Sequence, residues 1–245
     1  VELQFQSNDG AVIKTYSTKH KKNKLEVKAG GNEFVWNTRY DGAEKLDGMI
    51  FWSASFSGAK AVPGSYKVRL VVNGNEQMED FTILPDPRSE SSVADMQKQF
   101  DFVNDVNQTV DKAHKAIKSI REIRIKLKDF AKQNKTDSTA TQLVNQAKTI
   151  QDDLLEVEKT LYQTQNRSNQ DPLNFPIRLT NKLGHLNRLL TIDDFPPTNQ
   201  DIAVKEELTA AVEVAMERYQ QVIDSDVASF NEVFKKEKRN YLSTD

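Results

Sequence analysis

The stretch GSYKVRLVVNG, residues 64–74, alternates apolar and polar side chains and ends in a turn signal. Successive side chains of a strand point to opposite faces, so the alternation from Tyr66 to Val72 places its apolar side chains on one face. Asn73 and Gly74 can both adopt positive φ, which a type I′ hairpin requires. The stretch therefore predicts a strand and a tight turn, with residues 80–84 returning as the antiparallel partner.

Short apolar segments of the same period continue upstream, separated by turn signals such as Asn8-Asp9-Gly10 and Gly30-Gly31. About seven short strands at this spacing favour an antiparallel, immunoglobulin-like β-sandwich over residues 1–88. Because no helical pattern alternates with these strands, a parallel α/β sheet is unexpected. The strands expected before the hairpin are residues 1–5, 11–16, 25–28, 34–36 and 49–52.

The pattern changes after Pro85-Asp86-Pro87, because proline supplies no N–H to a sheet ladder. Ser89 or Ser91 is expected to cap a first helix. Apolar residues then alternate at intervals of three and four over about 40 residues without Pro or Gly, which is typical of a long packed helix. These apolar residues are Val93, Met96, Phe100, Val103, Val110, Ala113, Ile117, Ile120, Leu127 and Phe130.

Three further helices are expected between breaks at residues 134–138, 166–176 and 195–199. The second helix spans about 27 residues, the third is shorter, and the last, capped by Thr198 or Asn199, again spans about 40. The second and third helices together match the first in length. Residues 89–245 are therefore expected to form a long antiparallel bundle, either of three layers with an interrupted middle helix or of four helices. The whole chain is predicted to be a multidomain β + α protein.

Composition excludes several classes of protein. The formal net charge of −2 gives no reason to expect nucleic acid as a partner. The absence of cysteine removes disulfides, thiol nucleophiles and thiolate metal sites. No apolar run approaches the roughly 20 residues that a bilayer span needs. The chain opens Val1-Glu2-Leu3 without an initiator Met or a signal peptide, so we expect a piece of a longer protein.

Residues able to carry chemistry are scattered. His20, His114 and His185 lie in different elements and form no pair at metal-ligand spacing. The sequence has no Gly-x-Ser-x-Gly nucleophile motif and no glycine-rich phosphate loop. Adjacent carboxylates such as Asp152 and Asp153 on one helix point in different directions, whereas a glycosidase pair must face across a cleft. We therefore expect no catalytic site, no metal and no cofactor, and a protein that is not an enzyme.

Two groups of residues are candidates for contact with a ligand. The basic run around Lys21 and Lys22 is either a solvated hairpin loop or a contact for an anion or a polysaccharide. Trp36, Tyr40 and Trp52 are either core residues of the sandwich or an exposed platform for a sugar. Elsewhere, the first helix is rich in Lys and Arg while the second and fourth are rich in Asp and Glu, which favours charge pairing between neighbouring helices.

Several segments, in order along most of the chain, resemble the C-terminal region of large bacterial proteins with WD40/YVTN/BNR-like, sortilin-like propellers. The resemblance implies a β-propeller upstream, an immunoglobulin-like domain similar to the flagellar-hook-capping type, and a helical tail. No Asp-box pattern occurs here, so the glycosyl hydrolase label of that family does not extend to these residues. The similar segments are residues 29–40, 63–70, 84–88, 116–121 and 171–183.

The expected function is a non-catalytic structural or interaction region, accessory to an extracytoplasmic propeller protein. Its partner would be the propeller of the same parent chain, another protein, or a second copy bound through the helices. The alternative is a carbohydrate-binding module that uses the sandwich aromatics. Neither reading includes nucleic acid or a membrane span, and the periplasmic or secreted location follows from the resemblance alone.

Overall fold

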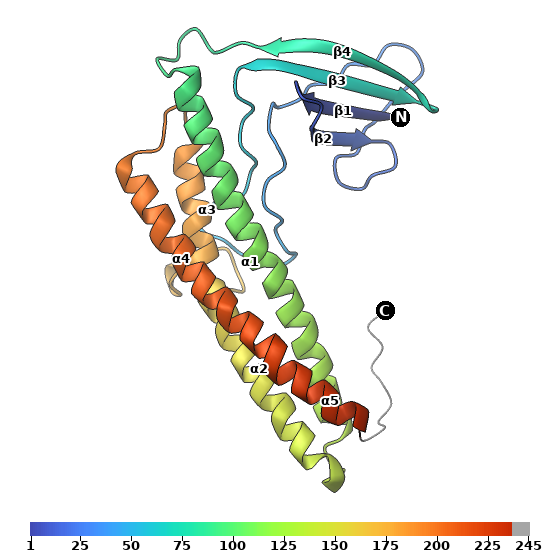
Figure 1. Ribbon diagram of the computed structural model, residues 1–245, viewed down its shortest axis with the longest axis vertical. Coiled ribbons are helices and arrows are strands. Elements are labelled where there is room, and N and C mark those ends of the chain that lie inside the picture. Colours follow the sequence, from blue (N-terminus) through green and yellow to red (C-terminus); the bar gives the residue numbers. More distant parts are fainter. Residues whose placement is uncertain (237–245) are drawn as a thin grey trace. The chain divides into compact units, whose positions relative to one another are not determined.

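The structure is a computed structural model that describes residues 1–236. An antiparallel sheet of four strands comes first and long helices follow from residue 93 onward (Figure 1). The predicted β plus α class is therefore confirmed. The chain forms two compact units: unit 1 comprises residues 1–43, 56–107 and 189–198, and unit 2 comprises the rest. The domain boundary at residue 88 stays a prediction.

The sheet of unit 1 has the strand order β2-β1-β3-β4. Its strands are β1 (Glu2–Ser7), β2 (Val12–Ser17), β3 (Gly64–Val72) and β4 (Asn75–Ile83), each antiparallel to its neighbours. The β3–β4 turn has φ of 51° at Asn73 and 87° at Gly74, so the predicted hairpin is confirmed.

The two faces of this sheet differ in polarity. On one face, Tyr66 lies opposite Phe81 and Phe5 lies opposite Val68, and this face carries the apolar core of the unit. On the other face, Gln6 donates to Gln4, and Gln4 accepts from Arg69. An antiparallel sheet commonly has one apolar and one polar face, and on this polar face Gln6 is only 7% exposed.

Three of the predicted strands are wrong. Residues 25–28, 34–36 and 49–52 are irregular, and only isolated bridges form nearby, between Ser17 and Lys24 and between Arg39 and Lys60. In the segment 34–36 the side chains still pack, since the Trp36 ring stacks on Phe5 at 4.3 Å between centroids. Phe34 and Val35 remain 37% and 80% exposed, so ring contacts form in this segment without a backbone ladder and without full burial.

Helix α1 (Val93–Gln133) has 41 residues and confirms the predicted first helix. Its cap is Ser92, whose Oγ accepts from the N–H of Asp95 at 3.1 Å, rather than Ser89 or Ser91. Ser89 Oγ instead accepts from the N–H of Ser91 and so belongs to the preceding turn. Val93, the first residue of α1, is 46% exposed. The buried seam of the helix begins at Met96.

The remaining helices follow the predicted order. After a 3-10 turn at Ser138–Ala140 come α2 (Thr141–Leu161) and α3 (Leu179–Leu190). A second 3-10 turn, Asp171–Leu173, lies in the loop between them. Helix α2 has 21 residues and is shorter than expected. The last helical stretch is α4 (Asn199–Gln221), a π-helical segment (Val222–Val227) and α5 (Ala228–Lys236).

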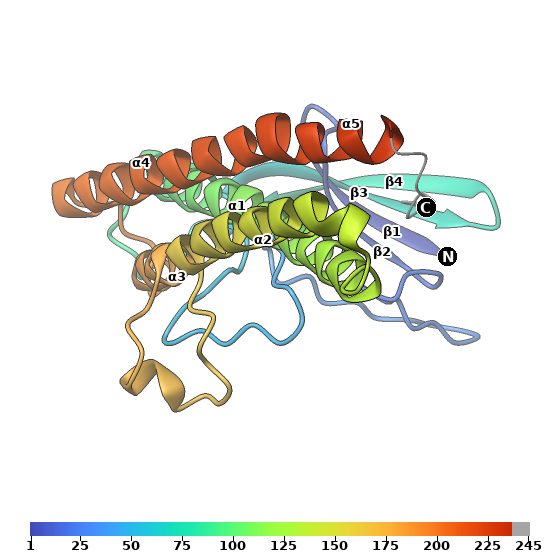
Figure 2. The ribbon, with the colours of Figure 1, turned by 90° about the horizontal axis from the view of Figure 1, so that it is seen from below.

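The helices of unit 2 lie side by side and share an apolar core (Figure 2). The inward face of each helix supplies side chains at helical spacing, so the three-and-four rhythm of the sequence is buried as expected. The core includes Val110, Ala113, Ile117, Ile120, Leu127, Phe130, Leu143, Ala147, Ile150, Leu154, Val157, Leu161, Leu183, Leu186, Leu208, Val212, Val222, Phe230 and Phe234.

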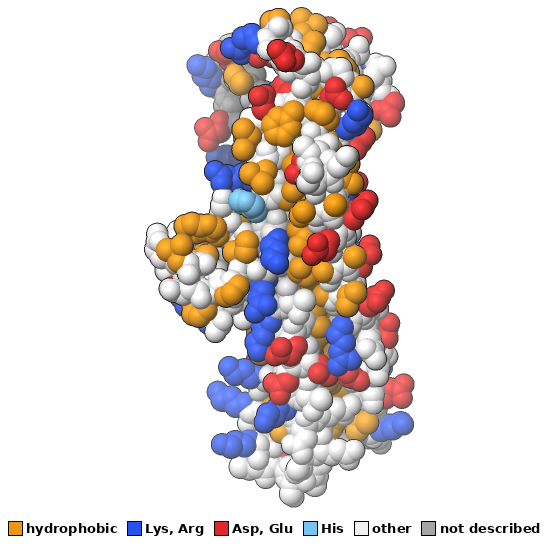
Figure 3. Space-filling model, turned by 90° about the vertical axis from the view of Figure 1, so that its left-hand side faces the viewer, with side chains coloured by type: hydrophobic (Ala, Val, Ile, Leu, Met, Phe, Trp, Pro, Cys, Tyr) orange, Lys and Arg blue, Asp and Glu red, His pale blue; other side chains and the backbone are white. Residues whose placement is uncertain are grey.

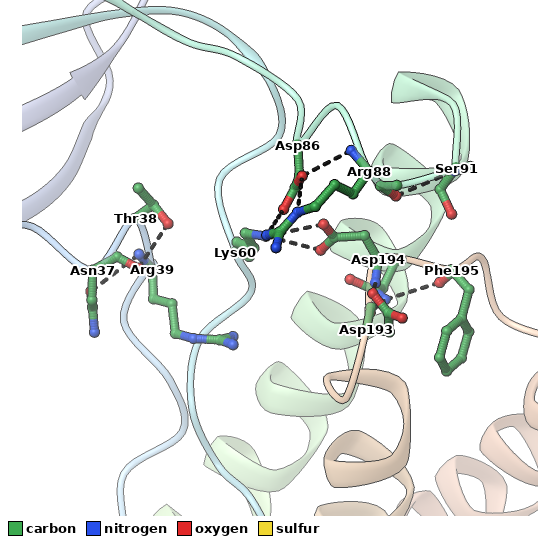
Figure 4. A network of polar contacts seen from close by, with 12 residues as sticks. Asn37, Thr38, Arg39, Lys60, Asp86, Arg88, Ser91, Asp193, Asp194 and Phe195 are labelled. Atoms are coloured by element: carbon green, nitrogen blue, oxygen red, sulfur yellow. Dashed lines mark hydrogen bonds and ion pairs between the residues drawn. The ribbon is translucent and has the colours of Figure 1, made fainter.

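Polar side chains hold the loops of unit 1. Gln99, only 7% exposed, donates through Nε2 to the carbonyls of Leu190, Asp193 and Phe195, at 2.7, 2.6 and 2.9 Å. Lys60 pairs with Asp194 at 3.0 Å (Figure 4). Arg88 bonds to Asp86, two residues before it.

Candidate functional site

Trp36 and Tyr40 are half-buried beside the core of unit 1. Both pack against the buried cluster of Ile13, Ala61 and Tyr66. Tyr40 also meets Phe100 edge-on at 4.8 Å between centroids, and burial raises the pKa of its hydroxyl to about 12. Their rings therefore make contacts inside unit 1. These contacts favour a packing role for the two residues over an exposed platform for a sugar.

The other three candidate residues lie elsewhere. Trp52 belongs to unit 2, and its side chain is 42% exposed. Lys21 and Lys22 line an open hollow of about 580 Å³ in unit 1, together with Lys14, Lys19, His20 and Asp41. The structure thus brings the two lysines together and the first two aromatics together, and it assigns Trp52 to the other unit.

An irregular segment, residues 44–55, packs on the helices of unit 2; we call it the strap. Its main chain is bound mostly by side chains of the helices. The N–H of Trp52 donates to Asn181 Oδ1, and Asn181 Nδ2 donates back to the Trp52 carbonyl, both at 2.8 Å. The N–H of Ile50 donates to the Tyr162 hydroxyl at 2.9 Å, and the N–H of Ser55 donates to the Gly184 carbonyl at 2.8 Å.

Two histidines complete this attachment. His185 donates from Nδ1 to the Ser53 carbonyl at 2.9 Å. His114, on α1 and fully buried, donates from Nδ1 to the Glu44 carbonyl. Burial lowers the pKa of His114, so its neutral form is favoured in the folded protein. Each histidine therefore binds the main chain of the strap, and His114 is an interior residue of unit 2.

A second feature of unit 2 is an open groove of about 610 Å³, which we call the arginine groove. Its floor is the buried Glu158 of α2, which accepts from Arg121 Nε at 2.7 Å and from Arg124 Nη1 at 3.1 Å. The predicted charge pairing between the first and second helices is thereby confirmed. The other residues lining the groove are Asp47, Gly48, Leu155, Lys159, Tyr162, Thr164, Gln165, Asn166 and Arg167.

The groove and the strap were not found from the sequence as sites. Asn181 and His114 occur within apolar helical patterns, where a polar residue gives no sign of which distant segment it binds. Arg121, Arg124 and Glu158 were recognised as charges on neighbouring helices, but the groove above them depends on the loop after α2. No local signal marks a groove formed by segments so far apart in sequence.

Within residues 1–236, no group of three or more His, Asp or Glu side chains is arranged to hold a metal ion. Across the same residues, none of the helices combines the length and the apolar character that crossing a membrane would require.

Comparison with known proteins gave no match: no protein-family model, no curated protein and no solved structure is significantly similar to the chain. The assignment of function therefore depends on the residues and their geometry.

Proposed function

We propose that this chain is a non-catalytic structural and interaction region that docks against a protein surface through unit 2. The observation that carries the proposal is that the polar side chains inside unit 2 bind the main chain of the strap. Asn181, His114 and His185 each bind the main chain of the strap, so these groups build a rigid surface. Two open grooves lie on the surface of unit 2, the arginine groove and a second groove beside α3 and α4.

One of these grooves is apolar. It has a volume of about 480 Å³ and lies between the start of α3 and α4, where Val214 is 66% exposed. Figure 3 shows hydrophobic side chains on this face beside acidic side chains that follow α4. An apolar strip with a charged margin is typical of a protein contact surface.

The resemblance to propeller proteins supplies the context of the proposal. In a parent protein of that type, this region would be accessory to an extracytoplasmic propeller and would dock onto it or onto a partner. The finer fold assignment belongs to the same proposal: an immunoglobulin-like unit followed by a three-layer antiparallel bundle. The lengths support the layers, because α2 and α3, with 21 and 12 residues, together approach the 41 of α1.

Hydrogen exchange tests the proposal. The amides of this chain would be compared alone and within the full-length parent protein. We expect added protection on the exposed faces of α3 and α4 in the parent, with the buried seam unchanged. Equal exchange in both forms would contradict docking through unit 2, and glycoside hydrolysis by this chain alone would contradict the non-catalytic assignment.

Carbohydrate binding is the second candidate, favoured by the exposed ring of Trp52. The internal packing of Trp36 and Tyr40 favours the first function, because a platform for a sugar needs open ring faces. Glycan-array binding that is lost in Trp52→Ala would support the second candidate. Absence of binding by the unmodified chain would argue against it.

A further inference from the structure

The arginine groove carries more positive than negative charge. Arg121 and Arg124 come from α1, Lys159 from α2, and Arg167 from the loop that follows α2. Against these four cations stand Asp47 and Glu158 of the lining and, outside the lining, Glu156, which pairs with Lys159 at 2.7 Å. An anion entering the groove would therefore meet a surplus of cations held in place by the fold.

Glu158 positions the two guanidinium groups without neutralising both. Its side chain is 4% exposed and bonds to Arg121 and Arg124 at once. The Arg121 guanidinium also lies 5.5 Å from the centroid of the Tyr162 ring, which further restricts its orientation. Cations fixed in this way bind a ligand with little loss of side-chain freedom.

Two buried polar atoms beside the groove have no hydrogen-bond partner among the described residues: Arg124 Nε and Asn166 Oδ1. The whole Asn166 residue is only 6% exposed. A buried polar group left without a partner is destabilising. Arg124 Nε is a donor that suits an oxyanion, and Asn166 Oδ1 is an acceptor that suits an N–H group.

We propose that the arginine groove binds an acidic segment of a partner protein, with an Asp or Glu carboxylate on the arginines and a neighbouring main-chain N–H on Asn166. The proposal builds on the proposed function and names the chemistry of the partner. A carboxylate suits paired guanidinium groups because each can donate two parallel hydrogen bonds. The adjacent N–H that Asn166 needs is present in every peptide.

An acidic glycan is less suited to this groove. Sugar rings are commonly bound against an open aromatic face, and Tyr162 is the only aromatic residue of the lining. Tyr162 is 5% exposed, with Arg121 over its ring and Phe51 at 5.5 Å between centroids. The groove therefore offers charge and hydrogen bonds but no open ring face.

The test measures binding of a fluorescent oligoglutamate peptide to the purified chain by anisotropy, with oligoglutamine as the uncharged control. We expect micromolar affinity at low salt that weakens as salt is added. Arg167→Gln removes an exposed cation of the groove and is expected to weaken binding about tenfold. Lys126→Gln removes an exposed cation that does not line the groove and should leave binding unchanged.

Asn166→Ala separates a ligand contact from a structural role. The Asn166 side chain makes no hydrogen bond within the described residues, so the variant should unfold at the same or a higher urea concentration while it binds the peptide several-fold more weakly. Asn169→Ala, at an exposed position of the same loop, is the matched control. A loss of stability in Asn166→Ala with unchanged binding would overturn the proposal.

Other ligands provide the remaining outcomes. Oligogalacturonate that binds more tightly than oligoglutamate would assign the groove to an acidic glycan, and competition by inorganic phosphate at similar concentration would make it a general oxyanion site; either overturns the proposal. Oligoglutamate that fails to bind also overturns it. If hydrogen exchange still shows docking in the parent protein in that case, the proposed function stands and only the acidic partner is wrong.

Discussion

Asn181 acts at the residue scale as a two-point clamp on the main chain. Its amide matches the N–H and the carbonyl of Trp52, and the residue is 4% exposed. Backbone groups of a loop that packs on helices need partners, because a buried unpaired N–H or carbonyl is costly. The strap obtains most of those partners from side chains of the helices, and the Ser55 N–H obtains its partner from the Gly184 carbonyl.

Asn181→Ala removes both hydrogen bonds and leaves two backbone groups of the strap unpaired. We expect the free energy of unfolding to fall by about 2 kcal/mol. Urea unfolding measures this loss, and faster hydrogen exchange of residues 50–55 would locate it. Asn145→Ala, at an exposed position on α2, should change stability by less than about 0.5 kcal/mol. Equal effects of the two variants would contradict the clamp.

His114 predicts a dependence of stability on pH. Because burial lowers its pKa below the usual 6.5, the unfolded chain binds more protons than the folded protein as pH falls through that value. Near His114 lie Asp111, Glu44 and Arg121, of which the two acids favour its protonated form and the arginine opposes it. The free energy of unfolding should therefore decrease from pH 7 toward pH 5.

His114→Asn keeps a donor for the Glu44 carbonyl but does not titrate. Urea unfolding across the same pH range should show a shallower decrease for this variant than for the unmodified protein. His20→Asn, in an exposed loop of unit 1, is the control and should retain the full decrease. A pH dependence that is unchanged in His114→Asn would show that another group is responsible.

At the scale of elements, the β3–β4 hairpin depends on two residues with positive φ. Gly74 has φ of 87° and open space around the position of a Cβ. Gly74→Ala should therefore lower the free energy of unfolding by about 1–2 kcal/mol through backbone strain alone. Gly31 has equally open space without positive φ, so Gly31→Ala should be neutral or slightly stabilising. Thermal unfolding measures the stability of both variants. Similar losses of stability in Gly74→Ala and Gly31→Ala would contradict the role of positive φ at Gly74.

The helices and strands also show where the local sequence pattern was sufficient to predict the structure. The β3–β4 hairpin and α1 were predicted because the turn and the seam lie within one continuous stretch of sequence. Residues 34–36 and 49–52 were wrongly assigned as strands, because a short apolar segment indicates burial and does not specify a ladder partner. The Ser92 cap was missed by one residue, within a serine-rich stretch that offers several similar caps.

At the scale of the whole molecule, α1 is shared by the two units: residues up to Asn107 belong to unit 1 and those from Gln108 to unit 2. A proline in a helix interior costs about 3 kcal/mol. Gln108→Pro should therefore destabilise both units, whereas Gln108→Ala, at the same exposed position, should be near neutral.

The effect of Gln108→Pro on each unit can be measured with the two tryptophans, because Trp36 is in unit 1 and Trp52 is in unit 2. In a Trp52→Phe background, fluorescence reports unit 1 while far-UV circular dichroism reports mainly the helices. We expect both transitions to shift together in Gln108→Pro. A fluorescence transition that stays in place while the helices unfold earlier would show that the units are independent.

The sequence by itself determined the change from sheet to helices, the hairpin turn and the buried seam of the helices, since these follow from spacing along a continuous stretch. Only the tertiary structure decided that residues 44–55 pack on helices, that Asn181 and His114 hold them, and that Arg121, Arg124 and Asn166 border one groove. The physical reason is distance along the chain: Trp52 and Asn181 are separated by 129 positions, and no local periodicity encodes such a contact.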